Sequence, residues 1–282
     1  MKLKKIKILD IKNDGLMNMA VECQYLYIRC NRSMYKYDLN SMSIIKQNEI
    51  FKKDGKARGF SIFNDFIFLW DFLDLYIINK SNLRITDIFR LGENLSSDIC
   101  GVMWFDPPKA YVKIRNGWIY VLDIIAKNIE KIQVSDSSFW SDCLTKNHLF
   151  IGTINGELLE INKTALKVTR KTQCCKKNIY SIVYENSLLY TASQDGTIKA
   201  VDAVTFETIN IAKKAVVGMV EFIGIHNGSL IIAGHRNPLA FWDKKTLQLC
   251  ESVDFPYNRS SVINNDTLFI CDNQSIYKVI IN

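Results

Sequence analysis

Short apolar runs alternate with polar turns along the whole chain. Runs of this length that are rich in Val, Ile, Tyr and Phe predict β-strands rather than helices. The clearest example is the stretch 188–209, where expected strands at 188–192 and 197–201 flank the turn Gln194-Asp195-Gly196, and a third strand is expected near 206–211. Asp-Gly favours a hairpin because Gly adopts positive φ at no steric cost.

This arrangement recurs with a period of about forty residues. Polar turns like that at 194–196 occur at 31–32, 71–74, 116–117, 155–156, 236–237 and 273–274. About seven residues after most of these turns, an Asp or Asn closes an apolar run, at Asp38, Asn79, Asp123, Asn162, Asp202 and Asp243. The steps between these six residues are 41, 44, 39, 40 and 41. Several short strands per unit at this spacing are typical of a β-propeller.

A second set of positions gives the same register. About fifteen residues before each turn, an inner strand opens on one side chain followed by a small or short polar residue, and the seven opening residues are Met17, Arg58, Cys100, Trp140, Tyr180, Val217 and Arg259. The prediction is an all-β, seven-bladed β-propeller with four-stranded antiparallel blades in a single domain, 1–282. The expected blades are 15–55, 56–97, 98–137, 138–177, 178–214, 215–255, and 256–282 together with 3–11.

The last blade explains the pairing expected for the N-terminal segment. After Asn273 there is room for one more strand, so the seventh unit lacks its fourth. The pattern of the segment 3–11 predicts a strand, and we expect this strand to be the missing fourth strand of the seventh unit. This pairing would close the ring without a long exposed edge. A frayed N-terminal tail is the alternative.

Two segments carry a resemblance to a known family. Ser193–Asp202, SQDGTIKAVD, is similar to the S-x-D-x-T-I-x-x-W-D segment of the WD-repeat (WD40) propellers, and Trp242-Asp243 stands where that family has its Trp-Asp dipeptide. The resemblance spans essentially the whole chain and implies a divergent WD-like propeller, with a seven-bladed relative from another lineage as the alternative. The family's Gly-His ahead of the inner strand is absent, and Gly234-His235 lies at a second turn instead.

Composition narrows the class of protein further. The net charge is +7 with scattered Lys and Arg, which indicates a solvated surface more than a polyanion-binding face. The most apolar run, 66–78, is too short to span a bilayer, and the N-terminus does not resemble a signal peptide. The eight cysteines form no C-x-x-C pair, so a reduced, cytoplasmic protein is expected.

Residues suited to catalysis do not cluster in the sequence. The three histidines, His148, His226 and His235, fall in turns on two expected faces, which predicts no metal site and no nucleophile–base pair. Cys174-Cys175 lies among lysines that would favour a thiolate, yet an inert surface or edge pair explains it better. We expect no enzyme activity, cofactor or metal.

Binding is the function that the sequence favours. The opening positions of the inner strands would surround one mouth of the channel, and they include Arg58, Arg259, Trp140 and Tyr180, with Arg32 and Arg236 in turns on the same face. Arg and large aromatic residues dominate binding hot spots. We expect a protein-interaction scaffold, monomeric alone, that binds a partner protein or peptide with an acidic segment.

The sequence also allows three alternatives to a partner-binding channel mouth. The same side chains could merely plug the channel. The chain could be a ligand-binding or catalytic propeller that uses the channel mouth. A basic surface could bind nucleic acid, although scattered lysines argue against it.

Overall fold

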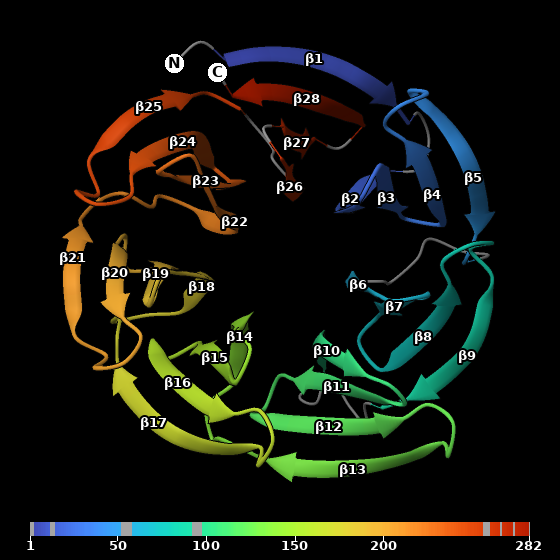
Figure 1. The fold of residues 1–282 in the computed structure, drawn as a ribbon, viewed down its shortest axis with the longest axis horizontal. Coiled ribbons are helices and arrows are strands. Elements are labelled where there is room, and N and C mark those ends of the chain that lie inside the picture. The colour runs from blue at the N-terminus through green and yellow to red at the C-terminus, as the bar shows by residue number, and fades with distance from the viewer. Residues whose placement is uncertain are drawn as a thin grey trace. The chain divides into compact units, whose positions relative to one another are not determined.

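The computed structural model describes residues 3–11, 15–51, 58–91, 98–255, 260–265, 267–272 and 274–281. The regular elements in these ranges are β-strands, which pair into seven four-stranded sheets (Figure 1). No helix among the described residues is long and apolar enough to cross a membrane. The chain divides into two compact units, residues 1–102 with 257–282 and residues 103–256.

The first unit contains three complete sheets. Their strands, in sheet order, are β2 (Leu16–Glu22), β3 (Tyr25–Cys30), β4 (Ser33–Asp38) and β5 (Ser43–Glu49); β6 (Gly59–Phe63), β7 (Phe66–Trp70), β8 (Asp74–Asn79) and β9 (Ile85–Arg90); and β1 (Leu3–Asp10), β28 (Ser275–Ile281), β27 (Thr267–Cys271) and β26 (Ser260–Asn264).

The other four sheets belong to the second unit, except that β10 begins in the last residues of the first. Their strands are β10 (Ile99–Asp106), β11 (Lys109–Ile114), β12 (Trp118–Asp123) and β13 (Asn128–Gln133); β14 (Phe139–Leu144), β15 (His148–Thr153), β16 (Glu157–Asn162) and β17 (Lys167–Gln173); β18 (Ile179–Glu185), β19 (Leu188–Ser193), β20 (Ile198–Asp202) and β21 (Thr208–Ala212); and β22 (Met219–His226), β23 (Ser229–His235), β24 (Asn237–Asp243) and β25 (Leu249–Val253).

The hydrophobic pattern of each strand matches the place of that strand in its sheet. The second strands are almost continuously apolar and buried, as in β15 and β19, because neighbouring sheets cover both of their faces. The fourth strands carry charged residues and are largely exposed, as in β5 and β13. Charged side chains on such an edge oppose pairing with other chains.

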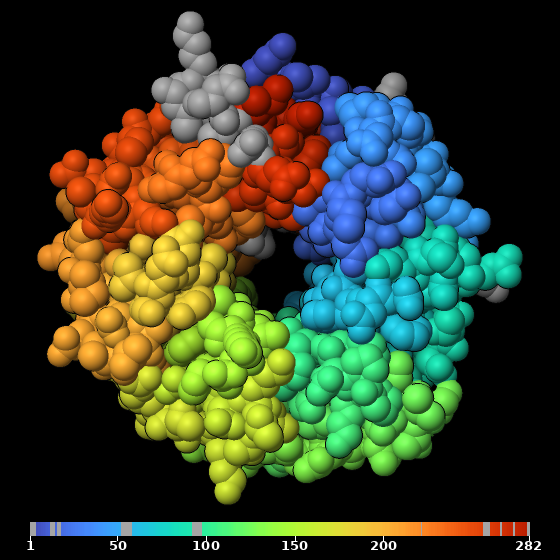
Figure 2. Space-filling model, in the orientation of Figure 1, coloured from blue at the N-terminus to red at the C-terminus, as the bar shows by residue number. Residues whose placement is uncertain are grey.

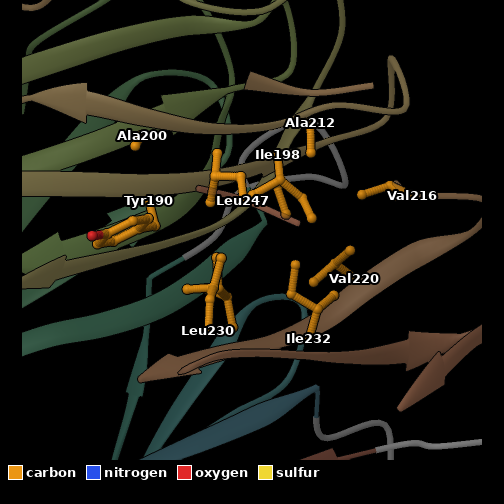
Figure 3. Close-up of a cluster of buried hydrophobic side chains, with 11 residues drawn as sticks. Tyr190, Ile198, Ala200, Ala212, Val216, Val220, Leu230, Ile232 and Leu247 are labelled. Carbon is orange, nitrogen blue, oxygen red and sulfur yellow. The ribbon is translucent and has the colours of Figure 1, made fainter. Parts of the chain in front are cut away.

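Two neighbouring sheets of the second unit show how the core forms. Tyr190, Ile198 and Ala212 from β19, β20 and β21 face Val220 and Ile232 from β22 and β23 in one buried cluster (Figure 3). Leu247, from the turn that follows β24, joins the same cluster. Burial of each large apolar side chain of this kind stabilises the fold by about 1.5–3 kcal/mol. The interface between sheets is therefore the main source of stability.

The six predicted corner residues all form the same turn. The side-chain oxygen of each accepts the backbone amides two and three residues later, as Asp202 does from Val204 and Thr205 at 2.7 and 2.8 Å. The complete set is Asp38, Asn79, Asp123, Asn162, Asp202 and Asp243. In each turn the residue four positions on has positive φ, and four of these residues are buried, namely Leu83, Leu166, Phe206 and Leu247. The corners therefore set the period and also anchor the outer strands.

Asp195 forms a different turn, which joins two sheets of the second unit. Its carboxylate accepts the amide of Lys176 at 2.7 Å and both the amide and the hydroxyl of Thr197 at 3.0 and 2.6 Å. Partial burial by itself would raise the pKa of Asp195, but these hydrogen bonds outweigh it and hold the pKa below its ordinary value.

The last sheet contains strands from both ends of the chain. β1 pairs antiparallel with β28, from Leu3 opposite Ile281 to Asp10 opposite Ser275. It is the outermost strand of that sheet, and its dark blue atoms lie against the red atoms of the C-terminal strands (Figure 2). Ile8, Leu9 and Ile11 pack on the core cluster of the first unit. The described part of the N-terminal segment is thus an ordered strand and not a frayed tail.

Removing residues 2–11 should therefore destabilise the protein. The deletion exposes the edge of β28 and the apolar side chains beneath Ile8, Leu9 and Ile11. We expect the melting temperature to fall by at least about 5 °C, measured by circular dichroism. Lys4→Ser, which changes an exposed side chain of the same strand, is the matched control. A truncated chain that melts like the full chain would contradict the structural role of β1.

Asp195 should also make stability depend on pH. Because its pKa is lower in the folded chain, its contribution is complete above the ordinary pKa of Asp, about 4, and is lost as the pH falls through the folded value. We expect Asp195→Asn to cost about 1 kcal/mol in urea unfolding at pH 6, and less at pH 3. A cost that does not change between the two pH values would rule out the ionised carboxylate as the cause.

Candidate functional site

The predicted residues Trp140 and Tyr180 come together in the second unit. Each follows the first residue of an innermost strand, β14 or β18, and these two strands are neighbours (Figure 1). The two rings meet edge to face, with centroids 6.2 Å apart. Arg115, from the turn between β11 and β12, places its guanidinium carbon 5.8 Å from the centre of the Trp140 ring. We call Arg115, Trp140 and Tyr180 the aromatic–arginine cluster.

β-bulges set the direction of both aromatic side chains. The strand register shifts between Phe139 and Ser141 in β14 and between Ile179 and Ser181 in β18, so Trp140 and Tyr180 are the unpaired extra residues. A bulge of this kind redirects a side chain out of the regular alternation. Both aromatic residues are half-buried, as is Arg115. One side of the cluster therefore packs on the protein and the other side is accessible.

A buried lysine holds the backbone beneath the cluster. Lys113 Nζ donates to the carbonyl oxygen of Trp140 at 2.7 Å and to the carboxylate of Asp142. Its side chain is only 4% exposed. At the equivalent pairing position, two other sheets have Gly152 or Ala192, whereas β3 has Arg29, which is also a buried basic residue. The backbone of Arg115 is fixed as well, because its carbonyl accepts the amide of Phe139 at 2.8 Å.

Arg58 has partners of its own in the first unit. Its guanidinium lies 3.3 Å from the Asp98 carboxylate and stacks on the Phe72 ring, with the guanidinium carbon 4.0 Å from the ring centre. Asp98 is buried and Arg58 is partly exposed. This arginine is therefore already bound by an aromatic ring and an acid, and it belongs to a different unit from Trp140 and Tyr180.

The remaining predicted arginines occupy turns or lie outside the described residues. Arg32 is exposed between β3 and β4, and its carbonyl accepts the amides of Ile50 and Phe51. Arg236 is exposed between β23 and β24 with a φ of 64°. Arg259 lies outside the described residues. The structure thus joins two of the six predicted site residues, Trp140 and Tyr180, and adds Arg115.

The sixth sheet requires a correction to the predicted register. Val217 was expected to be the equivalent of Trp140 and Tyr180, but it precedes β22 and is 82% exposed. The register shift in β22 lies between Val220 and Phe222, which makes position 221 the equivalent of the two aromatic residues. Position 221 lies 41 residues after Tyr180 and 15 before Arg236, as the repeat requires, so the prediction failed because Val217-Gly218 fits the pattern of a side chain followed by a small residue.

His148 was predicted to be a simple turn residue, and the structure gives it a partner. Its Nδ1 lies 3.0 Å from Oε1 of Glu160, whose Oε2 accepts hydrogen bonds from Arg170 at 3.2 and 2.9 Å. The three side chains line a surface groove of about 250 Å³ together with Thr145, Phe150, Tyr184, Ala203 and Val204. Arg170 also donates to the Ala203 carbonyl at 3.0 Å. The ion pair between Arg170 and Glu160 balances its own charges, and the bond from Arg170 to the Ala203 carbonyl ties two sheets together.

The Cys174-Cys175 pair was expected at the surface, and this expectation was wrong. Both residues are buried, with exposures of 6% and 3%. Their backbone amides donate to the carbonyl of Gly156. Both side chains lie in the interior between sheets. Among the described residues, no group of three or more His, Cys, Asp or Glu side chains is placed to hold a metal ion.

Comparison with known proteins identifies the fold. The computationally designed Ika8 protein, in its crystal structure, is similar to this chain with a TM-score of 0.74, over 98% of this chain and 99% of that one, at 8% identity. With seven four-stranded antiparallel blades, the chain is a seven-bladed β-propeller. No protein-family profile and no curated protein matches it.

Asp142→Ala should destabilise the protein because it leaves the Lys113 ammonium buried without its carboxylate. We expect a loss of about 3 kcal/mol in the free energy of unfolding, measured by urea titration. Lys113→Met combined with Asp142→Ala should recover most of the loss, since no charge then remains buried. A double variant as unstable as the single one would show that the ion pair is not the cause.

Proposed function

We propose that this propeller is a non-enzymatic protein-interaction scaffold and that the aromatic–arginine cluster is its partner-binding site. The observation that carries the proposal is the contact of Arg115, Trp140 and Tyr180 on adjacent blades. Trp, Tyr and Arg are the residues that most often dominate binding energy at interfaces. The cluster is half-buried and its backbone is fixed from below, so a partner loses little free energy in ordering it.

The chemistry of the cluster favours a partner segment that carries a carboxylate. A guanidinium binds carboxylates through two parallel hydrogen bonds, and the neighbouring rings supply apolar area at low entropic cost. The net charge of +7 would attract an acidic partner before contact. An acidic peptide segment with an apolar residue beside its carboxylate fits this combination.

The other candidate arginines have a lesser role in the proposal. Arg236, in the unit of the cluster, and Arg32, in the first unit, are each proposed as an additional exposed contact, and Arg259 remains a candidate from the sequence. Arg58 would have to leave Asp98 and Phe72 to bind a partner, so in the first unit we propose only a contribution from the exposed part of its side chain. Charges at an interface rim change association rates more than they change affinity.

We also propose that the chain is a divergent member of the WD-repeat family. Its support is Ser193–Asp202, in which Asp195 ties the turn to the preceding connection through the Lys176 amide and Asp202 forms the blade corner. Trp242-Asp243 ends β24 in the same way, with Asp243 at a corner. These corner hydrogen bonds are compatible with the family although its Gly-His is absent.

Variants of the cluster test the proposed site. The full chain would be used to capture partners from cells of its source, and the recovery of each co-purifying protein would be quantified. Trp140→Ala and Tyr180→Ala should weaken capture of the specific partner at least tenfold, because each removes an aromatic contact of a hot spot. Arg115→Glu should weaken capture most at low salt, where charge attraction is least screened.

The control is Lys171→Glu, an equal charge reversal at a side chain that is 70% exposed on the outer strand β17. It should leave capture unchanged. All variants must retain the circular dichroism spectrum of the parent chain. Folded cluster variants that recover every partner as well as the control does would overturn the proposal.

A further inference from the structure

The adjacent cysteines Cys174 and Cys175 form a buried dithiol in the second unit. They follow β17 and lie in the connection to β18. Their sulfur atoms are 3.7 Å apart and share a hydrogen bond. Their neighbours in the core include Phe150, Leu158 and Val201. The short distance between the sulfurs means that the two thiols can react with each other after only a local change in the backbone.

The backbone at this position does not require sulfur. The amides of Cys174 and Cys175 both donate to the Gly156 carbonyl, at 3.0 and 2.9 Å. Val134 and Ser135 make the same pair of bonds to Gly117, and Ala215 and Val216 make it to Gly196. The repeat therefore builds this connection from small, mostly apolar residues. Two thiols here add a reactivity that folding does not call for.

The surroundings activate one sulfur of the pair. The hydrogen bond shared with Cys174 lowers the pKa of Cys175 to about 7, burial opposes this, and the Lys199 ammonium assists it. The same shared hydrogen bond, together with burial, raises the pKa of Cys174. Lys199 is held in place because it donates to the Cys174 carbonyl. A thiolate beside a thiol is the arrangement from which disulfides form.

We propose that Cys174 and Cys175 are a reversible two-electron oxidation site that forms a disulfide between adjacent residues, with a small peroxide as the oxidant. The Cys175 thiolate attacks one peroxide oxygen, the O–O bond breaks, and hydroxide leaves as water after taking up a proton. The resulting sulfenic acid is attacked by the Cys174 sulfur, which loses its proton. The S–O bond breaks, the S–S bond forms and a second water leaves. Two thiols are oxidised and one peroxide is reduced.

Chain geometry makes this oxidation reversible. Adjacent Cα atoms joined by a trans peptide are about 3.8 Å apart, which is shorter than the roughly 4.4 Å at the lower limit of ordinary disulfides. The disulfide is therefore strained, and strained disulfides are reduced easily by small thiols. Since the Cys174–Cys175 peptide must distort, at least one of the two hydrogen bonds to Gly156 weakens in the oxidised form.

Peptide mass spectrometry tests this site directly. The reduced full chain is treated with hydrogen peroxide at pH 7.5, unfolded, alkylated and cut with trypsin, which places both cysteines in the peptide 172–176. We expect this peptide to lose two hydrogen atoms and to escape alkylation. When the oxidised chain is treated with glutathione before alkylation, the alkylated form of the peptide should return. Cys143 serves as the internal reference, because burial raises its pKa to about 11.

The matched variant is Cys174→Ala with Cys175→Val, which copies the Ala215-Val216 sequence of the next blade. It should fold and melt like the parent chain but show no change in this peptide. The single variant Cys174→Ala should give only sulfenic or higher acids at Cys175. The proposal is overturned if peptide 172–176 is oxidised no faster than Cys143. It is also overturned if oxidation occurs only as the circular dichroism signal is lost.

Discussion

Each blade of this protein must bury its middle strands on both faces, and a single four-stranded sheet cannot do that alone. Apolar strands such as β15 and β19 are covered only because another sheet packs on each side of them. In the second unit, side chains of β19–β21 interlock with those of β22 and β23 (Figure 3). Once that stacking supplies the stability, the turns at the ends of the strands are free to vary in sequence and to carry function.

The period of the fold could be predicted from the sequence because local hydrogen bonds form each corner. A corner such as Asp202 needs an Asx side chain and a residue of positive φ four positions later, and both belong to one short segment. The predicted corners and the seven blades were therefore correct. The hairpin at 194–196 was correct as well, since Gly196 has a φ of 88°.

The parts of the site that depend on contacts distant in the sequence could not be predicted in the same way. Arg115 reaches Trp140 from the preceding blade, and Lys113 holds the Trp140 carbonyl across the same interface. His148 looked like an isolated turn residue because Glu160 and Arg170 come from later strands. Pattern counting carries no information about these contacts. The bulge of the sixth sheet is a different case, because position 221 keeps the spacing of the repeat and was missed only because Val217-Gly218 resembles the start of the other inner strands.

The repeat itself offers a way to separate function from folding. At one pairing position two blades have Gly152 or Ala192, whereas two others bury a basic side chain, Lys113 with its carboxylate partner and Arg29. The same kind of comparison sets Cys174 and Cys175 against Ala215 and Val216. Stability alone would favour the uncharged, unreactive side chain at each position. Departures that carry a buried charge or a reactive thiol are thus the positions where selection for something other than folding is the simplest explanation.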